Sequence, residues 1–304
     1  MNALSNPSAS LKTGKGRIAF LGPVGTFSEE AALHYIKGQE TRGDSFGAAG
    51  ERLEPFPSIP AVALAVASGI AEEGVVPIEN SLEGSVTYTL DILIQEDRLS
   101  IRRELVLPIE HCLLVKPDTR ASDIQTVYSH PQALGQCRDF LERCFPKAQL
   151  VASLSTVAAV EDMKQSPTPA AAISPRRAAE LHSVEILAQG IQDNPSNATR
   201  FVILASSDHP LTGRDKTSLC FSFAEDKPGL LYNVMGEFAR RNINLAKVES
   251  RPTKRSLGQY IFLIDCEGHR EDAIVKEAIE AVRGQTSMLK IFGSYPRWRE
   301  PTTS

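Results

Sequence analysis

Thr199 and Arg200 lie side by side at the point where a loop is expected to enter a buried strand. Residues 194–197 are turn formers, and residues 201–204 (Phe-Val-Ile-Leu) are an apolar run of strand length. An arginine can bind a carboxylate through two hydrogen bonds, and a threonine can give a hydrogen bond or a proton to a nearby oxygen. The pair therefore suits an anionic substrate, although most such pairs at strand starts are solvated surface residues.

The length and composition of the chain indicate a soluble protein with two or three compact units. Its 304 residues are more than a single hydrophobic core ordinarily accommodates. The net charge of -4 and the pI near 5.9 argue against binding to a nucleic acid or an acidic membrane, because either partner requires a basic surface. No window holds the eighteen or so apolar residues of a membrane helix, and residues 1–17 lack a secretory signal, so we expect a cytoplasmic protein.

Cysteine and histidine are not spaced for metal binding. The five cysteines are scattered and contain no CxxC, so we expect them to be reduced and mostly core-filling. The six histidines show neither HxxxH nor HExxH. The sequence therefore predicts no metal site.

The first part of the chain reads as strands that each end in a turn and a helix. Residues 17–21 form a strand, and Thr26 and Glu29 then have the spacing of a helix capping box. A further strand at 74–78 runs into Glu79, Asn80 and Ser81. Polar residues at the carboxyl end of a buried strand are where open α/β sheets bind ligands, although a helix cap is an equally good interpretation.

A second run of strand and helix units follows, which predicts two α/β lobes. Residues 99–115 read as one long or two short strands that cross to the second lobe, and residues 199–204 could return the chain to the first. Several helices begin directly after a strand, with a Ser, Thr or His cap or an early Pro. If the lobes face each other, these helix N-termini line a cleft that suits a small molecule with several carboxylates.

The pattern changes after a polar linker at residues 206–216. Residues 217–296 read as strand, helix, strand, strand, helix, strand, which is the ferredoxin-like βαββαβ plan. One face of such a sheet is covered by its helices. We therefore expect the other face and the edges to pair with a second copy of the chain.

Five short segments, taken in order, resemble those of the prephenate dehydratase family and its close relative, arogenate dehydratase. The segments are 22–28 (Gly-Pro-Val-Gly-Thr-Phe-Ser), 76–84 (Val-Pro-Ile-Glu-Asn-Ser-Leu-Glu-Gly), 130–137 (His-Pro-Gln-Ala-Leu-Gly-Gln-Cys), 197–201 (Asn-Ala-Thr-Arg-Phe) and 249–252 (Glu-Ser-Arg-Pro). The resemblance implies an α/β, periplasmic-binding-protein-like catalytic domain of two lobes and a C-terminal ACT regulatory domain. No chorismate mutase segment is seen before the first strand, so we expect the monofunctional form.

The predicted boundaries follow from this plan. A disordered tail at 1–16 precedes a catalytic domain at 17–205, with lobes at about 17–95 plus 190–205 and at 96–189. The linker at 206–216 leads to the ACT domain at 217–296, and a second tail covers 297–304.

The resemblance implies conversion of prephenate to phenylpyruvate with loss of water and CO2, in phenylalanine biosynthesis. Aromatisation drives this reaction, so no cofactor is expected. The implied catalytic residues are Thr199, as acid or hydrogen-bond donor, and Arg200, which is either a carboxylate partner or an internal strut. The implied substrate-binding residues are Thr26, Asn80, Ser81, Gln136 and Phe201.

The resemblance also implies that phenylalanine is an allosteric effector, bound between the ACT domains of a homodimer or homotetramer. The implied contacts are Asp226, Gly229, Leu230, Leu231, Asn233, Glu249, Ser250, Arg251 and Pro252. The family's Gly-Ala-Leu-Val stretch is Gly-Leu-Leu-Tyr here, at residues 229–232, which leaves inhibition by phenylalanine open. Three alternatives remain at this point: arogenate as the substrate, another lyase acting on a related dicarboxylate, and a non-catalytic amino-acid sensor.

Overall fold

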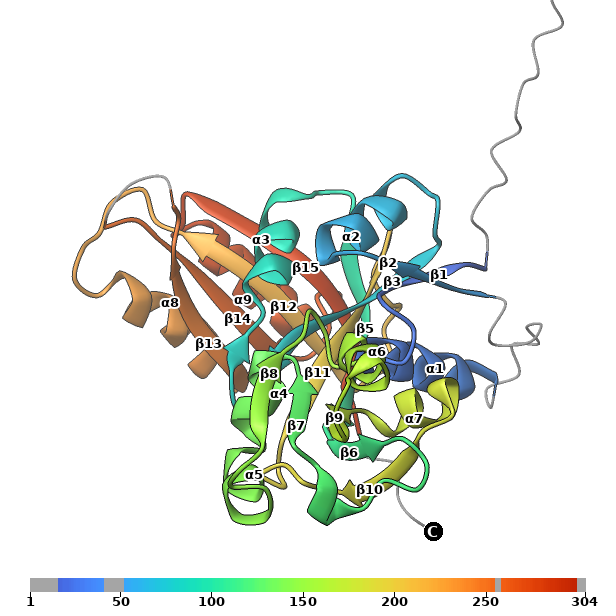
Figure 1. The fold of residues 1–304 in the computed structure, drawn as a ribbon. Helices are drawn as coiled ribbons and strands as arrows, with labels where there is room; N and C mark the ends of the chain where they lie inside the picture. Colours follow the sequence, from blue (N-terminus) through green and yellow to red (C-terminus); the bar gives the residue numbers. More distant parts are fainter. Residues whose placement is uncertain (1–15, 41–51, 255–257, 300–304) are drawn as a thin grey trace, which may run out of the picture.

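The structure is a computed structural model that describes residues 16–40, 52–254 and 258–299. The predicted tails at 1–16 and 297–304 lie mostly outside these residues. Within the described chain the long strands form three sheets (Figure 1). The first sheet belongs to the first lobe, the second sheet to the second lobe at the bottom of the view, and the third sheet to the C-terminal domain at the upper left.

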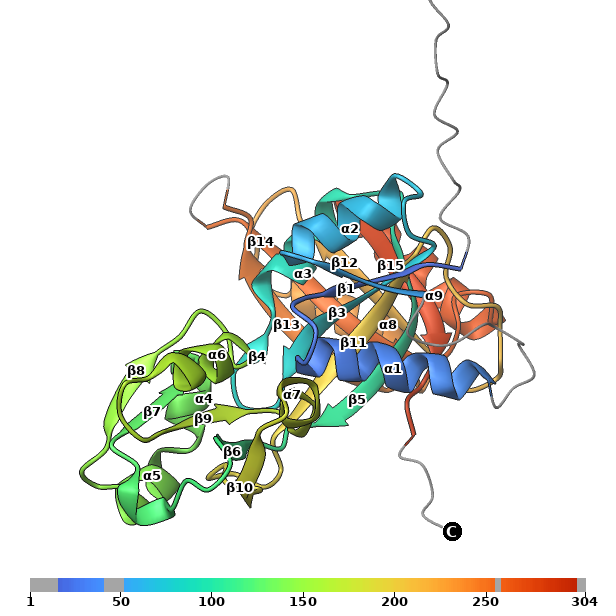
Figure 2. The same ribbon diagram turned by 45° about the vertical axis from the view of Figure 1, so that its right-hand side comes forward.

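The first-lobe sheet is built mainly from the N-terminal part of the chain. Its strand order is β2 (Leu53–Phe56), β1 (Ile18–Leu21), β3 (Glu73–Asn80), β11 (Ala198–Ala205) and β5 (Ser100–Pro108), with the short β4 (Gly84–Ser85) paired to β3. Figure 2 shows this sheet between α1 (Phe27–Glu40) on one side and α2 (Ile59–Ala67) on the other, with α3 (Thr87–Gln95) nearby. Ser58 caps the start of α2, because its hydroxyl accepts a hydrogen bond from the Ala61 N–H.

Strand β11 is central in this sheet and is buried on both faces. Phe201 and Ile203 pack with α1, whereas Val202 and Leu204 pack with the cluster under α2 and α3. Successive side chains of a strand point to opposite faces, so each second residue joins a different cluster. The predicted return of residues 199–204 to the first lobe is confirmed by the antiparallel pairing of β11 with β3 and β5.

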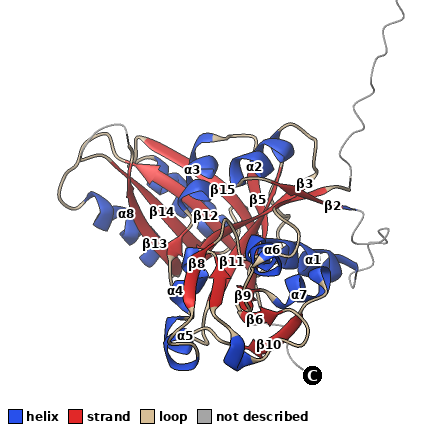
Figure 3. Cartoon of the chain, viewed as in Figure 1, coloured by secondary structure: helices blue, strands red, loops and turns tan. Residues whose placement is uncertain are grey.

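The second lobe has a five-stranded sheet with helices on its faces (Figure 3). Its strand order is β10 (Glu185–Gln189), β6 (Cys112–Val115), β9 (Ala170–Ser174), β7 (Thr126–Ser129) and β8 (Gln149–Ala152). Its helices are α4 (Pro131–Gln136), α5 (Arg138–Cys144), α6 (Ala158–Gln165) and α7 (Arg176–His182), and a short 3-10 helix covers Ala121–Asp123. The edge strand β10 was not expected from the sequence.

The predicted start of the second lobe at residue 96 is wrong. Residues 99–115 form two strands, and the first of them, β5, pairs with β11 along its whole length. β5 therefore belongs to the first-lobe sheet, and only β6 lies in the second. The chain consequently crosses between the lobes at about 109–111 and returns at about 190–197.

The C-terminal domain has the expected βαββαβ order. Its sheet runs β13 (Leu245–Pro252), β14 (Tyr260–Glu267), β12 (Asp215–Ser222) and β15 (Met288–Pro296), all antiparallel. Helices α8 (Leu230–Ala239) and α9 (Ala273–Arg283) cover one face through Val234, Phe238, Ala278 and Val282.

The sequence analysis expected the other face of this sheet to pair with a second copy of the chain. This expectation is wrong, because the face packs against the first lobe. Cys220, Leu263, Phe292 and Tyr295 join the same apolar cluster as Ile101 and other first-lobe residues. At Gly293 (φ +151°) the backbones approach so closely that an added Cβ would lie 2.2 Å from the Ile101 carbonyl oxygen. The face is therefore buried within the chain, and the edge strand β13 remains for pairing.

Candidate active site

Thr199 and Asn80 meet where β11 begins and β3 ends. The two residues are direct partners in the antiparallel register of these strands. Thr199 is 9% exposed, and its Oγ1 lies 2.9 Å from Asn80 Nδ2. The pair stands beside both crossings between the lobes, because the Ile109 N–H donates to the Asn197 carbonyl over 2.8 Å.

The orientation of the Asn80 amide is fixed by the backbone. Its Oδ1 accepts hydrogen bonds from the N–H groups of Leu82 (2.9 Å) and Glu83 (3.0 Å). Because a backbone N–H can only donate, the oxygen of the amide must face the turn and the nitrogen must face Thr199. Asn80 therefore donates to the Thr199 oxygen.

This direction leaves the Thr199 hydroxyl proton available. A hydroxyl has one donor hydrogen and two acceptor lone pairs, and one lone pair takes the Asn80 hydrogen bond. Within the residues that the structure describes, no protein acceptor is recorded for the hydroxyl proton. The group can therefore donate to an oxygen of a bound molecule, which is the role expected of it from the sequence.

The network continues from Asn80 into the second lobe. Asn80 Nδ2 also donates to Asn197 Oδ1 (2.9 Å), and Asn197 Nδ2 donates to Gln136 Oε1 (3.1 Å). Gln136 is the last residue of α4, and its Oε1 lies 3.0 Å from His111 Nε2. Predicted residues Asn80, Gln136 and Thr199 are thus brought together, joined by Asn197 and His111, whose roles the sequence interpretation missed.

His111 is buried, and its burial favours the neutral ring over the charged one. It is 3% exposed, its ring meets the Phe27 ring edge-on at 5.6 Å, and burial lowers its pKa below the ordinary value. A signal for it was present in the sequence, because it directly precedes the apolar run at 112–115, where a buried polar group requires a partner.

Thr26 and Ser81 lie near this network but are used locally. Thr26 Oγ1 donates to the Pro23 carbonyl (2.9 Å) and accepts from the Glu29 N–H (3.4 Å), as a helix cap does. Ser81 Oγ accepts from the Ala198 N–H over 3.0 Å and holds the loop before Thr199. Direct substrate binding by either hydroxyl stays a prediction.

The turn before α1 also touches the second lobe. A Cβ added to Gly25 would lie 3.3 Å from both Leu181 and Val157, and Val157 is the N-cap residue of α6. Across the same contact, Arg177 Nε lies 3.7 Å from Glu29 Oε2. Two of the helix N-termini that were expected to face each other are therefore close together.

Arg200 has a different environment from Thr199. Its side chain is 12% exposed, and it donates to Glu104 (2.8 Å), Asp265 (2.7 Å) and the Tyr295 hydroxyl (2.8 Å). Burial alone would raise the pKa of Asp265, but the Arg200 and Lys216 charges hold it below its ordinary value. The contacts favour the internal strut over the carboxylate partner, because the guanidinium is already occupied by protein acids.

Phe201 was predicted to bind substrate, and the structure places it in the core instead. It is 2% exposed and packs in the cluster formed by β1, α1 and β5. Its burial follows from the period of two along β11, which puts it beneath α1. A direct contact with substrate is therefore not carried forward for Phe201.

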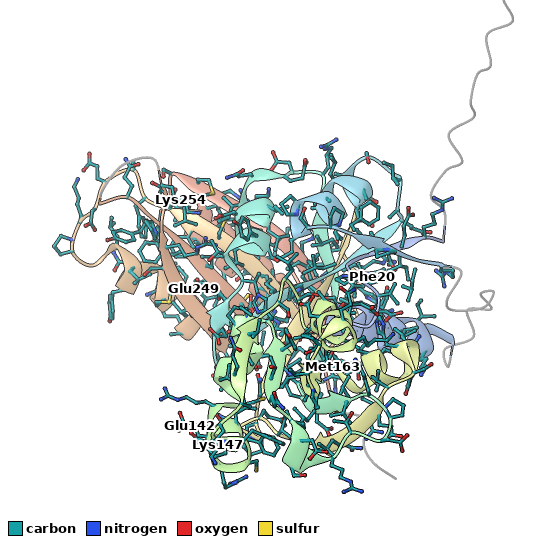
Figure 4. All side chains as sticks on the ribbon, in the orientation of Figure 1. Phe20, Glu142, Lys147, Met163, Glu249 and Lys254 are labelled. Carbon is teal, nitrogen blue, oxygen red and sulfur yellow. The ribbon has the colours of Figure 1, made fainter. Side chains whose placement is uncertain are left out.

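Seven of the nine residues predicted to bind phenylalanine separate into two sets, and the other two, Leu230 and Leu231, are half-buried at the start of α8. Asp226, Gly229 and Asn233 are exposed around the start of α8, and Ser250 and Pro252 are exposed on β13. Glu249 and Arg251 instead face the first lobe: Glu249 accepts from the Ser85 hydroxyl, and Arg251 donates to Asp91 over 2.8 Å. Figure 4 labels Glu249 on the sheet that adjoins the first lobe.

No group of three His, Cys, Asp or Glu side chains in the described part of the chain is arranged to hold a metal ion. Within the same residues, no helix is both long and apolar enough to cross a membrane.

Comparison with protein-family models identifies both parts of the chain. The prephenate dehydratase model matches residues 18–209, and the ACT domain model matches residues 220–284. The first match covers more than half of the chain. The protein belongs to the prephenate dehydratase family of enzymes and carries a C-terminal ACT domain.

Known relatives agree with this assignment. A prephenate dehydratase of Mycobacterium sp. (strain JLS) is 40% identical over 92% of this chain and 89% of its own length. A bifunctional chorismate mutase/prephenate dehydratase of Aquifex aeolicus is 39% identical over 93% of this chain and 74% of its own length. The crystal structure of an Arthrobacter aurescens prephenate dehydratase in complex with L-Phe aligns with a TM-score of 0.81, at 36% identity, over 92% of this chain and 90% of that one.

Proposed function

We propose that this protein converts prephenate to phenylpyruvate, with loss of water and CO2, and that Thr199 assists departure of the ring hydroxyl. The observation that carries the proposal is the hydrogen bond from Asn80 to Thr199 Oγ1, which leaves the Thr199 proton free to donate. The carbon–carbon bond to the ring carboxylate breaks, and its electrons enter the ring. The bond from the ring to the hydroxyl oxygen breaks, this oxygen takes up a proton from the solvent by way of the Thr199 hydroxyl and leaves as water, and CO2 departs.

A threonine hydroxyl is a weak acid, so Thr199 acts as a hydrogen-bond donor or proton relay to the leaving oxygen. General-acid assistance is worth roughly 10²–10⁴-fold in rate. Asn80 holds the Thr199 oxygen. Gln136 Oε1 already accepts hydrogen bonds from His111 and Asn197, which fixes the amide with its nitrogen turned away from them. This nitrogen has no protein partner among the described residues, and we propose that it donates to a substrate oxygen.

Regulation by phenylalanine at the ACT domain is part of the same proposal. The Arthrobacter aurescens relative was crystallised with L-Phe, and this chain places Asp226, Asn233 and Ser250 on exposed surface. The edge strand β13 would pair with a second copy to give a homodimer or homotetramer. A cytoplasmic location is proposed with it, and the five free cysteines support that location.

The experiment is a turnover assay of the purified protein with prephenate and, separately, with arogenate. Formation of phenylpyruvate is followed for the first substrate and formation of phenylalanine for the second. We expect phenylpyruvate, at a kcat/KM well above that for arogenate. A preference for arogenate would overturn the proposed substrate, and no turnover of either would overturn the proposed reaction.

A further inference from the structure

The amide and imidazole groups between the two lobes form one directed chain of hydrogen bonds. Its starting point is the pair of backbone N–H groups of Leu82 and Glu83, which fix the Asn80 oxygen. The Asn80 nitrogen must then donate to Asn197 Oδ1, so Asn197 presents its own nitrogen to the next group. Each amide orientation follows from the one before it.

The same logic determines the His111 tautomer. Gln136 Oε1 receives the Asn197 nitrogen, so this atom is an oxygen and can only accept. His111 Nε2, at 3.0 Å from Gln136 Oε1, must therefore carry the hydrogen. In a neutral ring Nδ1 is then a bare lone pair.

A second observation agrees with this tautomer. His111 Nδ1 is buried and has no hydrogen-bond partner within the described residues. A buried N–H without an acceptor would be costly, because a buried donor that cannot bond loses its water without replacement. The other tautomer would place its hydrogen at Nδ1 and would leave Nε2 and the Gln136 oxygen as two acceptors facing each other.

We propose that His111 is a positioning residue for the reaction: its Nε2–H anchors the second-lobe end of the chain, which through Gln136 and Asn197 ties the second lobe to the Asn80–Thr199 pair. This inference rests on the proposed function. The hydrogen-bond chain includes residues of both segments that cross between the lobes. His111 lies in the first crossing, between β5 and β6, and Asn197 lies in the second, directly before β11. The Gln136 amide of the second lobe is therefore held next to the Asn80–Thr199 pair when the lobes have the arrangement described here.

The test compares two substitutions of His111. His111→Phe keeps a ring of similar size beside Phe27 but removes the donor, whereas His111→Gln keeps an N–H near the position of Nε2. We expect kcat/KM for prephenate to fall about tenfold or more in His111→Phe, because small misplacements of a reacting group have effects of this size. We expect His111→Gln to recover to within about threefold of the wild type, with both variants folded by circular dichroism.

A double variant tests whether His111 acts through the chain. Asn197→Ala breaks the chain at its centre, so adding His111→Phe to it should cost less than about twofold more. Multiplicative effects of the two substitutions would overturn the proposal. So would a His111→Gln enzyme as impaired as His111→Phe, or a His111→Phe enzyme with wild-type kcat/KM.

A measurement independent of activity completes the test. The ¹⁵N chemical shifts of the His111 imidazole show which nitrogen carries the hydrogen, and we expect Nε2 protonated and Nδ1 bare. The opposite tautomer would overturn the proposal even if the enzyme is active. Absence of turnover in the wild type would instead count against the proposed reaction and would leave the tautomer result standing.

Discussion

Arg200 in the first lobe donates a 2.7 Å hydrogen bond to Asp265 in the C-terminal sheet, whereas the adjacent Thr199 hydroxyl faces Asn80 on the other side of β11. Two neighbouring residues thus serve different purposes. Thr199 belongs to the hydrogen-bond network of the candidate active site, whereas Arg200 ties the catalytic domain to the ACT domain. The alternation of side chains along a strand produces this division.

We predict that Arg200→Met destabilises the protein by about 3–5 kcal/mol, because it leaves Glu104 and Asp265 buried without their main counter-charge. Urea unfolding measures the change. Arg138→Met is the control: it breaks the exposed ion pair with Glu142, labelled in Figure 4, and should leave stability unchanged. A folded Arg200→Met enzyme of wild-type stability that has lost all turnover would show that Arg200 acts in the chemistry instead.

We predict that Gly293→Ala separates the ACT sheet from the first lobe. The added Cβ would meet the Ile101 backbone at 2.2 Å, and a backbone contact cannot be relieved by a rotamer change. The free energy of unfolding should fall by about 2 kcal/mol or more. Gly284→Ala is the control, because its nearest neighbour would lie at 3.7 Å. Equal stabilities of the two variants would contradict the close domain contact.

Lys247 of β13, the strand that carries predicted phenylalanine contacts, is joined to the end of β3 beside Asn80. Its Nζ lies 3.3 Å from Glu79, 2.6 Å from the Ser85 hydroxyl and 3.3 Å from Glu249. If phenylalanine bound to β13 acts through this contact, Lys247→Met should raise the phenylalanine concentration for half-inhibition about fivefold or more, in line with typical coupling energies.

Turnover of Lys247→Met without phenylalanine should change little, because Lys247 does not contact Thr199 or Asn80. The exposed Lys276 of α9 provides a charge-matched control, Lys276→Met. Unchanged sensitivity in Lys247→Met, with a sensitive wild type, would rule out transmission through this lysine.

Burial of His111 makes stability depend on pH. The pKa of His111 is lowered in the folded state, so below about pH 6.5 this histidine is protonated more readily in the unfolded chain than in the folded one. Proton binding then favours unfolding. This group's contribution is fully present above pH 6.5 and is lost as the pH falls. Between pH 7.5 and 5.5 the wild type should lose more stability than His111→Gln, by up to about 1.4 kcal/mol per pH unit. Parallel pH profiles of the two proteins would contradict the prediction.

The order of strands and helices could be read from the sequence because it depends on local patterns. The Ser58 cap, the Pro at the start of α4 and the βαββαβ order are examples. Residues Thr199, Asn80 and Gln136 were also found, through the family resemblance, and the structure brings them into one network.

Long-range packing could not be read in the same way. Arg200 has the same local sequence whether it binds a substrate or Asp265, which lies 65 residues away. The face of the ACT sheet away from its helices is buried because the domain packs on the first lobe. No periodic pattern in the sequence encodes such packing between domains. Neighbouring residues of a strand point to opposite faces, so the adjacency of Thr199 and Arg200 was a signal that could have separated their roles.

The turnover number of Thr199→Ala with prephenate tests the central claim most directly. We predict that kcat falls about 10²-fold or more while KM changes little, and that Thr199→Ser, which keeps the hydroxyl, stays within about tenfold of the wild type. Thr119→Ala, in the loop after β6, is the matched control and should behave like the wild type. A Thr199→Ala enzyme with an unchanged kcat would remove this hydroxyl from the chemistry.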